Sequence, residues 1–178
     1  MRRILPTLPL ATALLSLAAC VAPSAPRQAA MPVPAPAPPP PPAPALSSDW
    51  RDWPVTPGDW NYKQGAGGPV ASFGRAQANP DFWVRCDKAS RRIVLSRAGD
   101  AGTAGQMKLH TSFGVAVWPV QTAAGATPYA MTTLDALDPA LDRMAFSRGR
   151  FVIEVSGQPY LALPPWAEFL RVIEDCRG

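Results

Sequence analysis

The chain has 178 residues, of which 47% are hydrophobic and 17% are charged, and its formal net charge is +4. Arg2, Arg3 and Arg27 precede residue 49, whereas all 13 acidic residues lie within residues 49–178, so this segment carries a formal net charge of only +1. A nucleic-acid-binding domain needs a clustered basic face, and this composition argues against that class. About 130 residues suit one domain with a modest core.

The first 20 residues have the three parts of an export signal. Arg2 and Arg3 give a positive start, residues 10–17 form an apolar run, and small residues then precede Cys20. The apolar run is short for a membrane-spanning helix, which needs about 20 apolar residues. The segment is therefore predicted to direct export.

The run Leu17-Ala18-Ala19-Cys20 resembles the lipobox of bacterial lipoproteins. The resemblance covers residues 1–21. It implies that a signal peptide, residues 1–19, is removed and that the thiol of Cys20 is lipidated, which anchors the protein in a membrane. Val21 stands where many lipoproteins kept in the inner membrane have aspartate, so the resemblance implies an outer-membrane lipoprotein that faces the periplasm. An ordinary secretory signal is the alternative.

Residues 20–48 are dominated by proline and alanine, with an unbroken proline run at 38–42. Proline fixes φ and removes a backbone donor, so this segment is predicted to be an extended, semi-rigid tether. At about 3.1 Å per residue it spans roughly 85 Å. A docking site for a proline-binding module is the alternative, but the interleaved residues are mainly Ala, Val and Met, which offer little specificity.

The remaining segment, residues 49–178, is predicted to be one mainly β domain. Hydrophobic alternation or short apolar runs predict strands at 60–63, 70–73, 82–87, 93–95, 106–111, 115–118, 151–155 and 160–163. The first two and the last two of these segments flank turn residues and are predicted to be hairpins. We expect a small antiparallel β sandwich or a partly open barrel.

Two helices are predicted. The first, residues 138–146, has Asp138 as its N-cap and Pro139 at the first helical position. The second, residues 165–176, has apolar residues at helical spacing, and this stripe predicts that it packs on the sheet. Its apolar residues are Trp166, Phe169, Leu170, Ile173 and Cys176.

If Cys20 carries lipid, Cys86 and Cys176 are left to pair, as expected in an oxidising compartment. Cys86 lies on the apolar face of its predicted strand, and Cys176 lies on the apolar stripe of its predicted helix. A disulfide between them would hold the C-terminal helix across one face of the sheet. Two free or metal-binding thiols are the alternative, for which His110 is the one available imidazole.

The domain has no recognisable catalytic motif. His110 lies on the polar side of a predicted strand and is interpreted as incidental, and no nucleophile elbow, phosphate-binding loop or metal-ligand spacing is present. Asp135, Asp138, Asp142 and Glu154 are interpreted as surface acids, although two converging carboxylates would indicate action on a glycan. We therefore predict no catalytic residue, no cofactor and no metal.

Two groups of residues are candidates for binding. Trp50, Trp53 and Trp60 are suited to an interface or to stacking on sugar rings; the alternative is that they dock the first segment onto the core. Arg148 and Arg150 lie at a helix-to-strand junction, where they could hold a carboxylate or a phosphate. The alternative is a turn with solvated arginines.

These observations favour a membrane-anchored, non-catalytic binding or assembly module of the cell envelope. Its expected partner is an envelope protein or peptidoglycan, and not nucleic acid. One alternative is an inhibitor of lysozyme, because known lysozyme-inhibitor lipoproteins include small disulfide-bonded β-barrels; the resemblance is one of architecture only. Another is an enzyme or binder acting on peptidoglycan or another glycan.

Overall fold

The computed structural model describes residues 46–178, except residues 104 and 124. The predicted signal peptide, the predicted lipidation site at Cys20 and the predicted tether as far as residue 45 lie outside the described residues.

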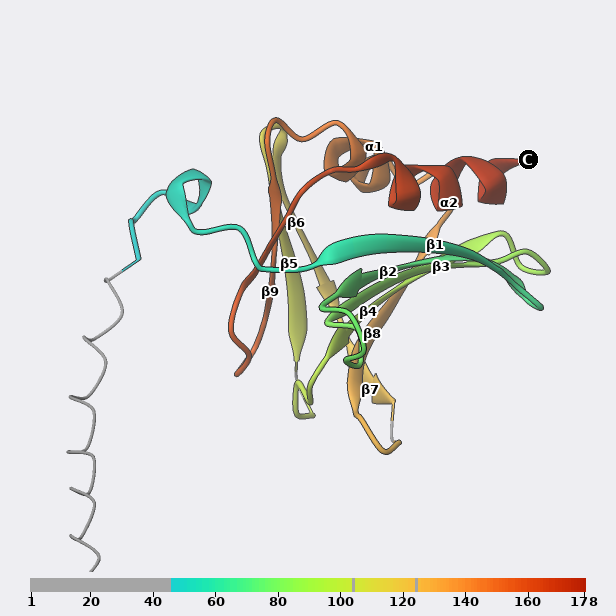
Figure 1. Ribbon diagram of the computed structural model, residues 1–178, viewed down its shortest axis with the longest axis horizontal. Helices are drawn as coiled ribbons and strands as arrows, with labels where there is room; N and C mark the ends of the chain where they lie inside the picture. The colour runs from blue at the N-terminus through green and yellow to red at the C-terminus, as the bar shows by residue number, and fades with distance from the viewer. Residues whose placement is uncertain (1–45, 104, 124) are drawn as a thin grey trace, which may run out of the picture. The chain divides into compact units, whose positions relative to one another are not determined.

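Two antiparallel sheets form the domain, and neither closes on itself, as the sequence predicts (Figure 1). Sheet A has six strands in the order β1-β2-β3-β4-β8-β7, and sheet B has four in the order β10-β9-β5-β6. The strands of sheet A are β1 (Asp59–Gly65), β2 (Gly68–Gly74), β3 (Phe82–Asp87), β4 (Arg92–Ala98), β8 (Tyr129–Asp135) and β7 (Gln121–Ala123). Those of sheet B are β10 (Leu161–Leu163), β9 (Phe151–Val155), β5 (Gln106–Thr111) and β6 (Gly114–Pro119).

Every strand predicted from the sequence is confirmed, and both predicted hairpins are antiparallel pairs. Strands β7 and β8 were not predicted. In β8 the inward positions are Ala130, Thr132 and Leu134, so small and polar residues weaken the alternation that marks a strand. β7 has only three residues, which is too short for a periodic signal.

Alternation along each strand separates an inner face of sheet A from an outer face. In β3, Phe82, Val84 and Cys86 are completely buried, whereas Trp83 is half-buried and Arg85 is exposed. The inner face of sheet A and the inner face of sheet B contribute to one hydrophobic core. From sheet B the core includes Met107, Leu109, Phe151, Ile153 and Leu163.

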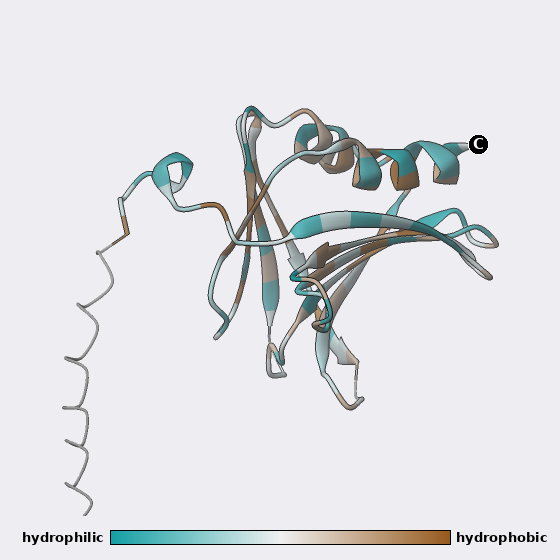
Figure 2. Cartoon of the chain, viewed as in Figure 1, coloured by the Kyte–Doolittle hydropathy of each residue, from teal (hydrophilic) through white to brown (hydrophobic). Residues whose placement is uncertain are grey.

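Both predicted helices are present, and a short 3-10 helix, η1 (Trp50–Asp52), precedes the first strand. Helix α1 (Pro139–Ala145) is capped at its N-terminus by Asp138, whose side chain accepts a hydrogen bond from the backbone N–H of Ala140 at 2.8 Å. Helix α2 (Ala167–Arg177) lies over β1, β2 and β3 with its hydrophilic residues turned away from the sheet (Figure 2). Its buried residues are Phe169, Val172, Ile173 and Cys176.

A disulfide joins α2 to the middle of sheet A, as predicted. The Sγ atoms of Cys86 and Cys176 are 2.03 Å apart, and the bond closes a sequence separation of 90 residues. The Tyr62 hydroxyl of β1 donates a hydrogen bond of 2.7 Å to Asp175, next to the disulfide. Before the helix begins, Trp60 Nε1 donates to the Pro164 carbonyl at 2.9 Å. The helix is therefore tied to the sheet near both of its ends.

We predict that replacing Cys86 and Cys176 together with alanine lowers the free energy of unfolding by up to about 4–5 kcal/mol, because the disulfide no longer restrains a loop of this length in the unfolded chain. Urea denaturation with and without reductant measures the effect. Reductant should destabilise the wild-type protein and leave the double variant unchanged. Two reactive thiols at these positions in the native oxidised protein would show that the bridge is absent.

Candidate functional site

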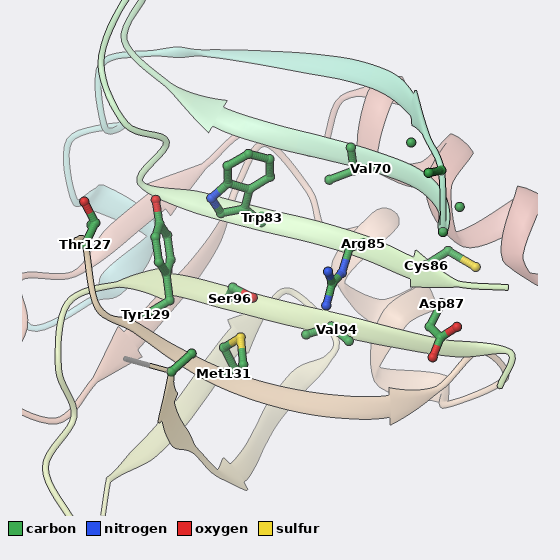
Figure 3. Close-up of a pocket in the computed structure, with 15 residues that line it drawn as sticks. Val70, Trp83, Arg85, Cys86, Asp87, Val94, Ser96, Thr127, Tyr129 and Met131 are labelled. Atoms are coloured by element: carbon green, nitrogen blue, oxygen red, sulfur yellow. The ribbon is translucent and has the colours of Figure 1, made fainter. Parts of the chain in front are cut away.

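The outer face of sheet A, on the side away from α2, contains a pocket of about 720 Å³ (Figure 3). This volume lies within the usual range for small-molecule sites, roughly 300–1,000 Å³. Strands β2, β3, β4 and β8 form its floor. The β1–β2 turn, residues 65–68, borders it on one side, and Ala123 and Thr127 border it on another. We call it the outer pocket.

Aromatic and aliphatic side chains make most of the lining of the outer pocket. Trp83 and Tyr129 are half-buried, with ring centroids 6.5 Å apart in an edge-to-face arrangement. The Tyr129 hydroxyl donates a hydrogen bond of 2.9 Å to the Pro80 carbonyl, which holds the ring in place. The remaining large apolar residues of the lining are Val70, Val94 and Met131. The pocket therefore has a rigid aromatic pair at one end.

Arg85 is the cation of the outer pocket. Its cross-strand neighbours are Val70 and Val94, so its stem lies between two aliphatic side chains (Figure 3). Its guanidinium forms no ion pair or hydrogen bond with another described residue, whereas several other arginines of the described chain do. Arg85 is thus a positive charge at the surface that makes no hydrogen bond or ion pair within the described chain, although its charge contributes to the lowered pKa of the nearby Asp87.

The carboxylate of the pocket, Asp87, is already engaged in a turn. It accepts hydrogen bonds from the Ser90 hydroxyl at 2.7 Å and from the Ala89 backbone N–H at 3.1 Å. The Ser90 hydroxyl holds the pKa of Asp87 below its ordinary value, so this carboxylate is ionised at neutral pH. Asp87 therefore acts as a local negative charge beside Arg85 and is not poised as a general acid.

Backbone geometry requires glycine in the turn that borders the pocket. Gly68 has φ of +139°, and a Cβ atom at this position would lie 2.4 Å from the Cys86 carbonyl oxygen. The neighbouring Gly67 carbonyl accepts a hydrogen bond from the Lys88 backbone N–H at 3.2 Å. The β1–β2 turn is therefore held close against the end of β3.

The three tryptophans singled out in the sequence do not form one platform. Trp60 belongs to the core, with 5% of its surface exposed, and so presents no face to a ligand. The Trp50 ring lies 6.0 Å from the His110 ring, and the Trp53 ring lies 4.7 Å from the Tyr160 ring. Trp50 and Trp53 therefore pack on different parts of the domain. This arrangement agrees with the alternative interpretation, in which these residues dock the first segment onto the domain.

The two arginines of the α1–β9 junction are also separated by their contacts. Arg150 donates from Nη1 to the Trp53 carbonyl and so helps to hold the first segment in place. Arg148 is exposed, and its backbone N–H donates to the Ser112 hydroxyl at 2.9 Å. The pair does not converge on a shared anion site.

His110 lies on sheet B, with Nε2 2.5 Å from a carboxylate oxygen of Glu154. Lys108 Nζ is 3.7 Å from the same oxygen. Among the described residues, no hydroxyl or thiol group makes a hydrogen bond to His110. His110 and Glu154 therefore form a pair on sheet B, and neither residue lines the outer pocket.

The other three acids named from the sequence serve local structure at separate places. Asp135 accepts a hydrogen bond from the Leu137 backbone N–H at 2.9 Å. Asp138 caps α1, and Asp142 forms an ion pair of 2.8 Å with Arg177. These carboxylates each have a structural partner, and none of them lines the outer pocket.

In the described part of the chain, no group of three or more His, Cys, Asp or Glu side chains is arranged to hold a metal ion. None of the described helices is long and apolar enough to cross a membrane. Comparisons with models of protein families, with curated proteins and with solved structures find no match. The chemistry of the outer pocket must therefore be inferred from its own residues.

Sequence reasoning missed the outer pocket. The alternation at 82–87 places Trp83 and Arg85 on the face opposite Cys86, and an aromatic residue beside an arginine on an outward face was the available signal. Tyr129 and Met131 come from β8, which was not predicted, so their place beside Trp83 had no local signal.

Proposed function

We propose that the protein is a lipid-anchored lipoprotein of the bacterial outer membrane and that its periplasm-facing β domain is a non-catalytic binding module. The lipobox-like run that ends at Cys20 supports the anchor, and the proline-rich residues 20–48 support a tether. The outer pocket is the observation that carries the binding function. Its volume, its mainly apolar lining and its few polar groups are those of a ligand site.

The lining of the outer pocket supports binding rather than catalysis. Arg85 offers hydrogen-bond donors and no acceptor, so it can hold an anion but supplies no general base. Asp87 is the one carboxylate of the lining, whereas glycoside hydrolysis requires a pair of carboxyl groups across the scissile bond. His110 lies on sheet B, outside this lining. The groups that remain can hold and orient a ligand.

The proposed anchor predicts that Cys20→Ser releases the protein from the membrane fraction or leaves its precursor uncleaved, because serine cannot carry the thioether-linked lipid. Fractionation of the producing cells, with mass spectrometry of the N-terminal peptide, measures both effects. Ser24→Ala is the matched control, which changes a residue of the predicted tether just after Cys20 and should leave fractionation unchanged. Normal maturation and membrane association of Cys20→Ser would refute the anchor.

The proposed binding face predicts that a photo-crosslinking residue placed at Met131, inside the outer pocket, captures a recurrent envelope component in living cells. The same residue at Arg171, exposed on the outer side of α2, is the control and should capture no such component. Mass spectrometry identifies the adducts, before and after digestion of the wall with a muramidase. Recurrent capture from Arg171 but not from Met131 would move the binding face away from the outer pocket.

A further inference from the structure

The proposed binding function leaves the ligand of the outer pocket open, and the inference below rests on that function. We infer that the ligand is an acidic saccharide: a sugar ring lies against Trp83 and Tyr129, and a carboxylate of the same molecule is held by Arg85. Three features of the pocket carry this inference, namely its aromatic pair, the guanidinium of Arg85 and the Ser96 hydroxyl beside Trp83.

The aromatic pair suits a ring rather than a hydrocarbon chain. Trp83 and Tyr129 stand on the same face of the sheet, and the hydrogen bond from Tyr129 to Pro80 fixes one ring before any ligand arrives (Figure 3). Rigid aromatic side chains offer contact area at a low cost in conformational entropy. An acyl chain gains affinity by being removed from water on all sides, but the outer pocket is open to solvent. A sugar ring can cover the aromatic faces with its apolar side and keep its hydroxyls in water.

The cation lies at the right place for an acidic group on such a ring. Arg85 and Trp83 are two residues apart in β3 and therefore point to the same face, about 6.6 Å from each other along the strand. A guanidinium binds a carboxylate through two parallel hydrogen bonds, and the aliphatic neighbours of Arg85 favour that geometry by limiting its side-chain freedom.

Hydroxyl groups flank Trp83 on both sides. Ser72 and Ser96 are its cross-strand partners in β2 and β4, so all three side chains share the outer face. Ser96 lines the outer pocket and is only 9% exposed, and its hydroxyl makes no hydrogen bond to another described residue, whereas Ser72 lies outside the lining. A polar group this deep in a ligand site gains a partner when a sugar hydroxyl or amide binds.

Charge limits the ligand to a weakly acidic one. Asp87 follows Arg85 by two residues on the same face, and its low pKa keeps it ionised, so a second anionic group beyond the first is repelled. Residues 49–178 have a formal net charge near zero and would not attract a polyanion over a long range. This arrangement fits a saccharide that has one carboxylate for every few sugar rings, and it does not fit a nucleic acid.

Nuclear magnetic resonance of the tryptophan indole groups tests the inference. For this experiment, residues 21–178 are produced behind a cleavable secretory signal so that the disulfide forms, since the described core lies between Trp60 and Cys176. The Trp83 signal is assigned with Trp83→Phe. Galacturonate, which has a single carboxylate, is the acidic probe, and galactose is the neutral probe of the same ring type. Laurate is the apolar anion, and disaccharide-peptides from digested peptidoglycan test that source.

The inference predicts that galacturonate or the disaccharide-peptides shift the Trp83 signal and that galactose binds more weakly. Arg85→Gln should weaken binding of the acidic probe about tenfold or more, because a charge-assisted contact is lost, and should leave binding of galactose unchanged. Arg148→Gln is the matched control and should change neither. Far-ultraviolet circular dichroism confirms that each variant is folded.

Other outcomes separate this inference from the proposed function. Equal shifts with the neutral probe, unaffected by Arg85→Gln, would overturn the acidic ligand and keep the pocket as a binding site. Shifts of the Trp83 signal with laurate alone would overturn the saccharide ligand and keep the pocket as a binding site. No shift with any probe would overturn the saccharide; if crosslinking from Met131 also captured nothing, the proposed binding function would fail with it.

Discussion

The Cys86–Cys176 disulfide fastens helix α2 across the inner face of sheet A, and both faces of that sheet depend on it. Its strand partner lies in β3, near the middle of the sheet, so the bond holds the helix where Phe169 and Ile173 meet the core. A domain of this size buries a modest core. A covalent link between its last helix and its sheet stabilises the folded state beyond what apolar packing supplies. The outer face then has a rigid floor.

One strand illustrates how the two faces divide their roles. Val84 is completely buried against the core, and Arg85, the next residue of β3, stands in the outer pocket between two valines. The twist natural to a six-stranded sheet hollows such a face, while the glycine turn at residues 65–68 adds a border close to the floor. The outer face of sheet A thus presents an aromatic pair and a cation, while the inner face is held by the core and by the disulfide.

Local patterns in the sequence predicted most of this fold and little of the site. Alternation and helical spacing predicted the strands and both helices, and the disulfide followed because Cys86 and Cys176 each lay on an apolar face. The outer pocket depends on the register of β3, β4 and β8, which brings Trp83, Ser96 and Met131 into one row, and no local pattern encodes such a row. Conversely, residues close in sequence can lie apart in the fold: Trp60 enters the core, away from Trp50 and Trp53.

The central claim is that the inner face of sheet A stabilises the fold while the outer face is free to bind, and the unfolding free energies of two adjacent variants test it most directly. Val84→Ala should lose about 2 kcal/mol, because two buried methyl groups are removed. Arg85→Ala should stay within about 0.5 kcal/mol of the wild-type protein, because its exposed guanidinium has no partner in the described chain. An Arg85→Ala loss as large as that of Val84→Ala would mean that this arginine serves the fold, and the account of the outer pocket would be contradicted.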